Sequence, residues 1–128
     1  MITLKADEAN RILTIVMTGM IAEADIDAAM DQLQAQFPAV GVHIRGGERG
    51  SFNVLMDWEN LDGWEKGAKT VGMMTAKFIS DAMRKIAVVA DAKWADEQPR
   101  LADIAKRAAV RFFPPAERAI AVAWLGEK

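Results

Sequence analysis

Three carboxylates near the end of one apolar run are the residues best suited to chemistry. Asp57, Glu59 and Asp62 close or follow a predicted strand over residues 52–57, so they converge at the carboxyl edge of a sheet. Carboxylates placed there could hold a hard cation or act as an acid–base pair. The same residues also have structural roles, because Asp62 and Glu65 form a capping box and Asp57 can bond loop N–H groups. We therefore expect no metal ion and no cofactor.

Nucleophilic catalysis lacks its usual residues. The chain has one histidine, His43, two serines, Ser51 and Ser80, and no cysteine. A catalytic triad needs a histidine that touches its nucleophile, and no nucleophile motif lies beside His43. The glycine-rich loop at residues 46–50 lacks the Lys-Ser/Thr pair of a P-loop and precedes a strand. The sequence therefore favours a protein that is not an enzyme.

Composition describes one globular domain over residues 1–128. Hydrophobic residues make up 52% of the chain and charged residues 27%. No apolar run approaches the ~20 residues of a membrane span, and the N-terminus lacks the pattern of a signal peptide. We expect a cytoplasmic protein, peripheral at most to the inner membrane face. Residues 1–64 carry four Lys/Arg and ten Asp/Glu, and residues 65–128 carry twelve and eight, so no single basic surface dominates and general nucleic-acid binding is disfavoured.

Strands and helices alternate in the predicted order β-β-α-β-α-β-α-β-α. Residues 2–6 and 11–20 form a hairpin, and residues 23–37 form an amphipathic helix. Residues 39–51 are ambiguous, with a short strand at 40–44 as one reading. The later elements are strands at 52–57, 85–90 and 110–113, and helices at 63–83, 92–108 in two parts, and 114–125. This alternation predicts an α/β fold with a mostly parallel sheet.

The helix at residues 63–83 carries two stripes. One is apolar and contains Trp64, Ala68, Val71, Met74, Phe78 and Ala82. The other is basic around one methionine and contains Lys66, Lys69, Met73, Lys77 and Arg84. A helix with a basic stripe around an apolar residue can lie on an anionic membrane surface. In the alternative interpretation, the apolar stripe packs in the core and the basic stripe is simply the solvent-exposed face of the helix. Trp94 follows the next strand, where it can plug the core or wall a pocket.

The spacing of several segments resembles the SpoIIAA-like proteins, small relatives of the STAS domain. The segments are Leu61-Asp-Gly-Trp64, Arg84–Asp91 with Trp94, Val110-Arg-Phe-Phe113, and Ala119 to Leu125. The resemblance implies one STAS-like domain with a β-α superhelix, shared in outline with CRAL-TRIO lipid-transfer domains. For some members it implies binding of apolar ligands or association with membranes.

One departure from the STAS pattern affects the expected mechanism. STAS antagonists of anti-sigma factors are phosphorylated on a serine in an Asp-Ser-Ser-Gly turn after the third strand. The matching segment here reads Asn60-Leu-Asp-Gly63, and no hydroxyl residue lies between Ser51 and Thr70. The resemblance therefore implies no phosphate switch at this place.

We expect a non-enzymatic protein that binds an apolar or lipid-like ligand between the helices at 63–83 and 92–108. Trp64, Val71, Met74, Phe78 and Trp94 would line that site. Lys66, Lys69, Met73 and Lys77 would contact an anionic membrane. The alternative is a STAS-type regulatory module that docks a protein partner, and a homodimer remains open.

Overall fold

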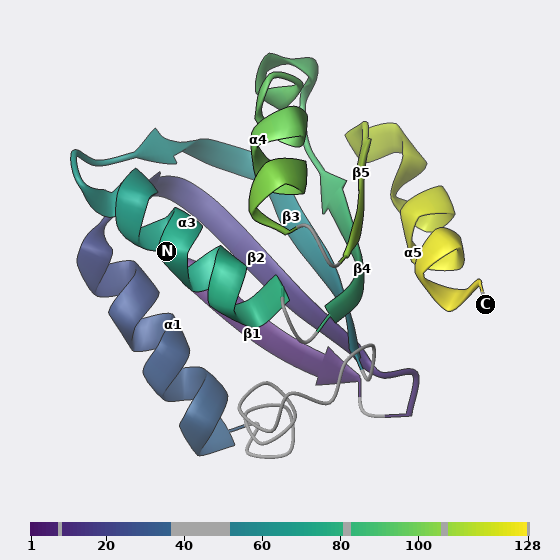
Figure 1. The fold of residues 1–128 in the computed structure, drawn as a ribbon, viewed down its shortest axis with the longest axis horizontal. Coiled ribbons are helices and arrows are strands. Elements are labelled where there is room, and N and C mark those ends of the chain that lie inside the picture. Colours follow the sequence, from purple (N-terminus) through teal and green to yellow (C-terminus); the bar gives the residue numbers. More distant parts are fainter. Residues whose placement is uncertain (8, 37–51, 81–82, 106–107, 128) are drawn as a thin grey trace.

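A five-stranded sheet with helices on both faces forms the protein, as the computed structural model shows (Figure 1). The structure describes residues 1–7, 9–36, 52–80, 83–105 and 108–127. The strands lie in chain order across the sheet: β1 (Ile2–Asp7), β2 (Ile12–Ile21), β3 (Phe52–Trp64), β4 (Met83–Val89) and β5 (Ala109–Phe113). β1 pairs antiparallel with β2, and the other neighbours are parallel. The predicted α/β fold, the N-terminal hairpin and the order of elements are confirmed.

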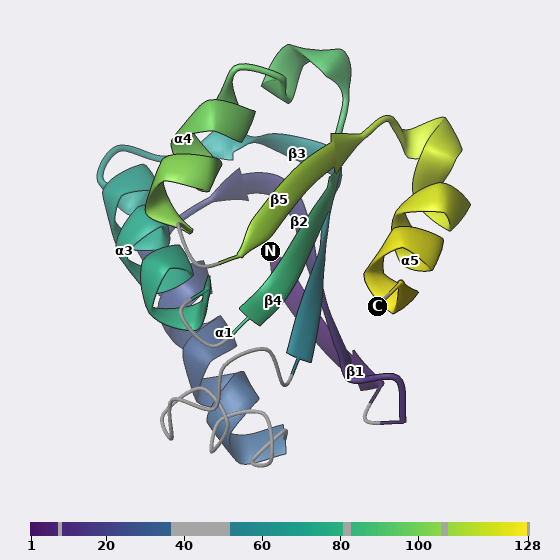
Figure 2. The same ribbon diagram turned by 45° about the vertical axis from the view of Figure 1, so that its right-hand side comes forward.

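Three helices cover one face of the sheet, and a single helix covers the other (Figure 2). The first face, here called the inner face, carries α1 (Glu23–Gln36), α3 (Ala68–Ser80) and α4 (Glu97–Ile104). The outer face carries α5 (Arg118–Gly126), which contacts β3, β4 and β5. A short 3₁₀ turn precedes each of α4 and α5, at Ala92–Trp94 and Pro115–Glu117.

The core follows from the alternation of side chains along the strands. In β2, Leu13, Ile15 and Met17 point to the inner face and are buried in the larger apolar cluster. The outer face has a smaller cluster, made by Leu55, Ala87, Val89, Phe113, Ala121 and Leu125. The two faces therefore have separate apolar layers on one shared sheet.

β3 is longer than the sequence predicts, and the helix after it starts later. The strand does not end at Asp57, because it continues beside β2 as far as the pair Ile21 and Trp64, with two register shifts. Leu61 is buried on the way, and exposed Asp62 lies within the strand. The expectation that Asp62 caps a helix is therefore wrong, since strand pairing overrides the local capping pattern.

Glycine sets the start of α3. Gly67 has φ +88°, and a Cβ there would lie 2.8 Å from Oε1 of Glu23. This φ would strain a residue with a side chain, whereas the short contact is only with the movable end of the Glu23 side chain. The helix begins at Ala68 in consequence, five residues after the predicted start.

Some predictions fall on parts of the chain outside the described residues. These are the strand at 40–44, the glycine-rich loop at 46–50, and the residues His43 and Ser51. The side chains of Phe78 and Ser80 also lie outside the described part, although both residues belong to α3.

Candidate functional site

Small side chains on α3 face the sheet and leave two cavities beside the helix. Ala68 is fully buried, and Gly72 and Ala76 line both cavities. An added Cβ at Gly72 would lie 3.6 Å from Cδ1 of Ile26 and 3.8 Å from Nε1 of Trp64, which is ordinary contact distance. The core therefore has room at this position that the sequence leaves unfilled.

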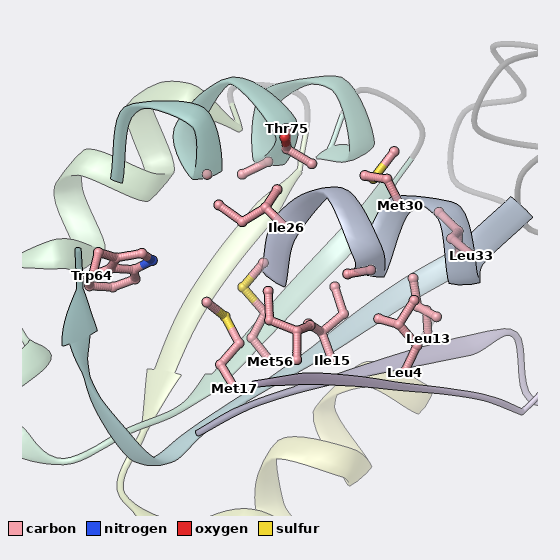
Figure 3. Close-up of a pocket in the computed structure, with 14 residues that line it drawn as sticks. Leu4, Leu13, Ile15, Met17, Ile26, Met30, Leu33, Met56, Trp64 and Thr75 are labelled. Carbon is pink, nitrogen blue, oxygen red and sulfur yellow. The ribbon is translucent and has the colours of Figure 1, made fainter. Parts of the chain in front are cut away.

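The first cavity lies beneath α1 and α3 and has a volume of about 80 Å³. Figure 3 shows Trp64 at one end and Leu4, Leu13 and Leu33 at the other. Its floor includes Ile15, Met17 and Met56 from the sheet, and its described lining contains one hydroxyl, that of Thr75. Such a cavity suits an apolar group.

The second cavity, of about 90 Å³, lies between α3 and α4. It shares Met17, Met56, Trp64, Gly72 and Ala76 with the first cavity. Charged groups lie along it: Glu97 bonds Lys69 at 2.9 Å and Arg100 at 3.4 Å. One carboxylate between two cations leaves this end with a formal charge of +1. The second cavity is therefore amphipathic, whereas the first is apolar.

Three tryptophans pack edge to face beside the second cavity. The ring centroid of Trp58 lies 5.5 Å from that of Trp64 and 6.2 Å from that of Trp94, and the centroids of Trp64 and Trp94 are 5.4 Å apart. The Trp58 indole N–H donates to Sδ of Met17 at 3.2 Å. The buried N–H of Trp94 has no acceptor within the described part of the chain. This cluster closes the carboxyl end of the sheet and fixes the position of Trp64.

The structure brings only part of the predicted ligand site together. Trp64 lines both cavities, whereas Val71 packs into the core beside them and Trp94 belongs to the tryptophan cluster. Met74 is 69% exposed and lines neither cavity, so its predicted inward orientation is wrong. The side chain of Phe78 lies outside the described part. The helical stripe is rotated because small residues, rather than large ones, face the sheet.

The predicted basic stripe is divided by the same rotation. Lys66 and Lys77 are exposed, but Lys69 pairs with Glu97 and lies 5.7 Å from the ring centroid of Trp64. Met73 lines the second cavity instead of facing outward. These four residues therefore do not form one continuous face for a membrane.

Sequence reasoning missed the residues that shape the cavities. Met17 and Met56 form their common floor, and Gly72 forms their common roof. Gly72 was one available signal. A glycine in a helix interior costs about 1 kcal/mol relative to alanine, so its presence there needs a packing or functional reason. The eight methionines of the chain indicated an adaptable apolar lining, but the sequence did not show which of them would form it.

The three carboxylates of β3, Asp57, Glu59 and Asp62, do not form the cation site that the sequence left open. Arg118 at the start of α5 donates to Oδ2 of Asp57 at 2.5 Å and to Oε2 of Glu59 at 3.2 Å. Its hydrogen bond with Asp57 is the main cause of a raised pKa for the Arg118 guanidinium. Among the residues that the structure describes, no three His, Cys, Asp or Glu side chains gather as metal ligands. Asp57 and Glu59 therefore secure α5 to β3.

Within the described residues, none of the helices has both the length and the apolar character to cross a membrane.

The topology and the helical layers are those of a STAS-like α/β domain. The sequence model of the SpoIIAA-like family matches residues 12–126, and the chain belongs to that family. A solved structure of an uncharacterized protein from Shewanella loihica, assigned to the DUF3478 family with a SpoIIAA-like fold, is similar with a TM-score of 0.74. It is 16% identical, and the alignment covers 98% of this chain and 92% of that one. The search of curated proteins finds no match. The family is generally non-enzymatic.

Proposed function

We propose that the protein is a non-enzymatic regulatory module of the STAS type, which docks a protein partner through its outer face. Family membership supports this proposal. The observation that carries it is the incomplete cover of the outer face. α5 packs over β3, β4 and β5, whereas Thr14 and Val16 of β2 are only half-buried.

The centre of the uncovered area, at Thr14 and Val16, is uncharged, and charged residues flank it: exposed Lys5 lies opposite Thr14 in β1, and Asp57 lies beside Val16 in β3. Val122 of α5 is 43% exposed and Met20 at the end of β2 is 52% exposed. Thr3 lies opposite Val16 in the register of β1 and β2, which extends the area to the sheet edge. An uncharged centre with charged residues at its rim is typical of a protein interaction site.

The area has a rigid frame because α5 is held at both ends. Arg118 bonds Asp57 and Glu59 at the start of the helix, and Lys85 bonds the backbone oxygens of Trp124 and Glu127 at its end. Docking then needs little reorganisation of the module, which lowers the cost of binding.

The turn after β3 contains no phosphate acceptor. Residues 60–63, where the STAS comparison places that turn, belong to β3 in this structure. The real turn is Glu65-Lys66-Gly67, and it also lacks a hydroxyl. The proposed docking therefore proceeds without phosphorylation at this turn.

Affinity capture from a native lysate tests the proposal. We expect a stoichiometric partner to be retained by the wild type and lost by the double variant Val16→Glu, Val122→Glu. Met74→Glu is the matched control, because it places the same charge on an exposed apolar residue of α3, a helix of the opposite face. Equal capture by all three proteins would contradict the use of the outer face.

A second function, binding of an apolar ligand, is favoured by the two cavities beside α3. Their shared lining is apolar, and methionine side chains adapt to ligands of different shape. Mass spectrometry after organic extraction of the purified protein tests for a co-purifying molecule. Membrane contact through Lys66, Met74 and Lys77 is part of this candidate, and charge reversal of both lysines should weaken binding to anionic vesicles.

A further inference from the structure

We infer that the two cavities form one slot for a short, single-chain carboxylate of about six to eight carbon atoms. This inference rests on the second candidate function and specifies its ligand. It starts from the shared wall of the cavities, which consists of Gly72 and Ala76 above and of Met17 and Met56 below, with Trp64 at the end. These five residues include no branched or charged side chain that would keep the two volumes apart.

The size of the slot sets the length of the ligand. The volumes of about 80 and about 90 Å³ together slightly exceed the ~150 Å³ of an engineered cavity that binds benzene. Typical sites for larger ligands measure roughly 300–1,000 Å³. A chain of six to eight carbons fits, whereas a two-chain lipid does not.

Flexible side chains allow the two volumes to join without a movement of the helices. Met17 and Met56 are unbranched and have three rotatable bonds each, so a bound alkyl chain can displace their ends. Gly72 brings no side chain into the passage, and a Cβ added there would have Ile26 and Trp64 as its nearest neighbours. The passage therefore opens by changes of rotamer alone.

Polarity sets the direction in which the ligand lies. Thr75 provides the only hydroxyl among the described residues around the first cavity, so the alkyl tail lies there. At the second cavity, Arg100 makes one long contact of 3.4 Å with Glu97, and its side chain is 59% exposed. Its guanidinium keeps donors for another acceptor, and Lys69 adds a second cation. A carboxylate fits this end better than a hydroxyl does.

The test is titration calorimetry of the full chain with octanoate, octan-1-ol, palmitate and phosphatidylglycerol vesicles. We expect octanoate to bind about tenfold more tightly than octan-1-ol, as one charge-assisted hydrogen bond predicts. Palmitate and the vesicles should bind more weakly than octanoate. Equal affinity for octanoate and octan-1-ol, or tighter binding of palmitate or vesicles, would overturn the inference.

Two variants locate the site. Arg100→Gln should weaken octanoate about tenfold and leave octan-1-ol unchanged. Ala76→Leu fills the shared wall and should weaken both compounds, while Met74→Leu on the exposed side of α3 should weaken neither. If Ala76→Leu fails to fold, Gly72→Ala replaces it, because its added Cβ meets only ordinary contacts. Unchanged octanoate binding in the folded variant would overturn the inference.

Failure of this inference can be distinguished from failure of the apolar-ligand function. If octanoate does not bind but an extracted apolar molecule is found, the function stands and the ligand class is wrong. If octanoate does not bind and extraction yields nothing, both are wrong.

Discussion

Lys85 is a buried cation that bonds to backbone oxygens. Its side chain is 9% exposed, and Nζ donates to the oxygens of Trp124 at 2.8 Å and Glu127 at 2.6 Å. Both acceptors lie at the carboxyl end of α5, where unpaired carbonyls and the helix dipole favour a positive charge. The centroid of the Trp124 ring lies 5.2 Å from the same nitrogen. Lys85 thus joins β4 to the end of α5.

The first prediction concerns this residue. Lys85→Met keeps the apolar stem and removes the donors, so we expect a loss of between about 1.5 and 3 kcal/mol in the free energy of unfolding. Lys93→Met is the matched control, since exposed Lys93 lies 5.3 Å from the ring centroid of Trp94. The control should lose less than about 1 kcal/mol. Urea denaturation measures both, and equal losses would show that the backbone bonds of Lys85 contribute little.

At the scale of elements, α3 shows what the sequence could and could not predict. Hydrophobic runs and turn signals predicted the order of strands and helices, because those signals are local. The length of β3 depends on pairing with β2, and the rotation of α3 depends on how closely the helix approaches the sheet. The hydrophobicity pattern predicts that Met74 faces the core. In the structure the helix turns its small residues, Gly72 and Ala76, toward the sheet instead, and Met74 is exposed. Among the described residues predicted to line the site, only Trp64 lines the cavities, although the second cavity lies between the two helices that the sequence prediction named.

Substitution by alanine should have opposite effects on stability at Gly72, inside α3, and at Gly67, directly before it. Gly72→Ala should raise the free energy of unfolding by about 1 kcal/mol, because alanine favours a helix interior and its Cβ meets no close contact. Gly67→Ala, one residue before the helix, should lower it by more than about 1 kcal/mol, because φ +88° strains alanine. Thermal unfolding measures both, and a rise in Tm for Gly67→Ala would contradict the account of how α3 begins.

At the scale of the whole molecule, one sheet separates two candidate sites. β3 and β4 supply both layers, since Val54 and Val88 belong to the inner cluster and Leu55 and Val89 to the outer one. A ligand beside α3 and a partner beside α5 would therefore share strands without sharing side chains. The arrangement suits a module in which each site can be changed by mutation without destroying the other.

Hydrogen exchange with octanoate tests this separation. Ligand at ten times its Kd should stabilise the native state by about 1.4 kcal/mol, so amides that exchange by global unfolding should slow about tenfold. These amides should lie in β3 and β4, whose side chains belong to both clusters, and in β2, whose buried side chains belong to the inner cluster. Amides of α5 that exchange by local opening should keep their rates, because that helix contacts neither cavity. Slower local exchange in α5 would mean that the two faces are coupled, and the outer face would then respond to the ligand.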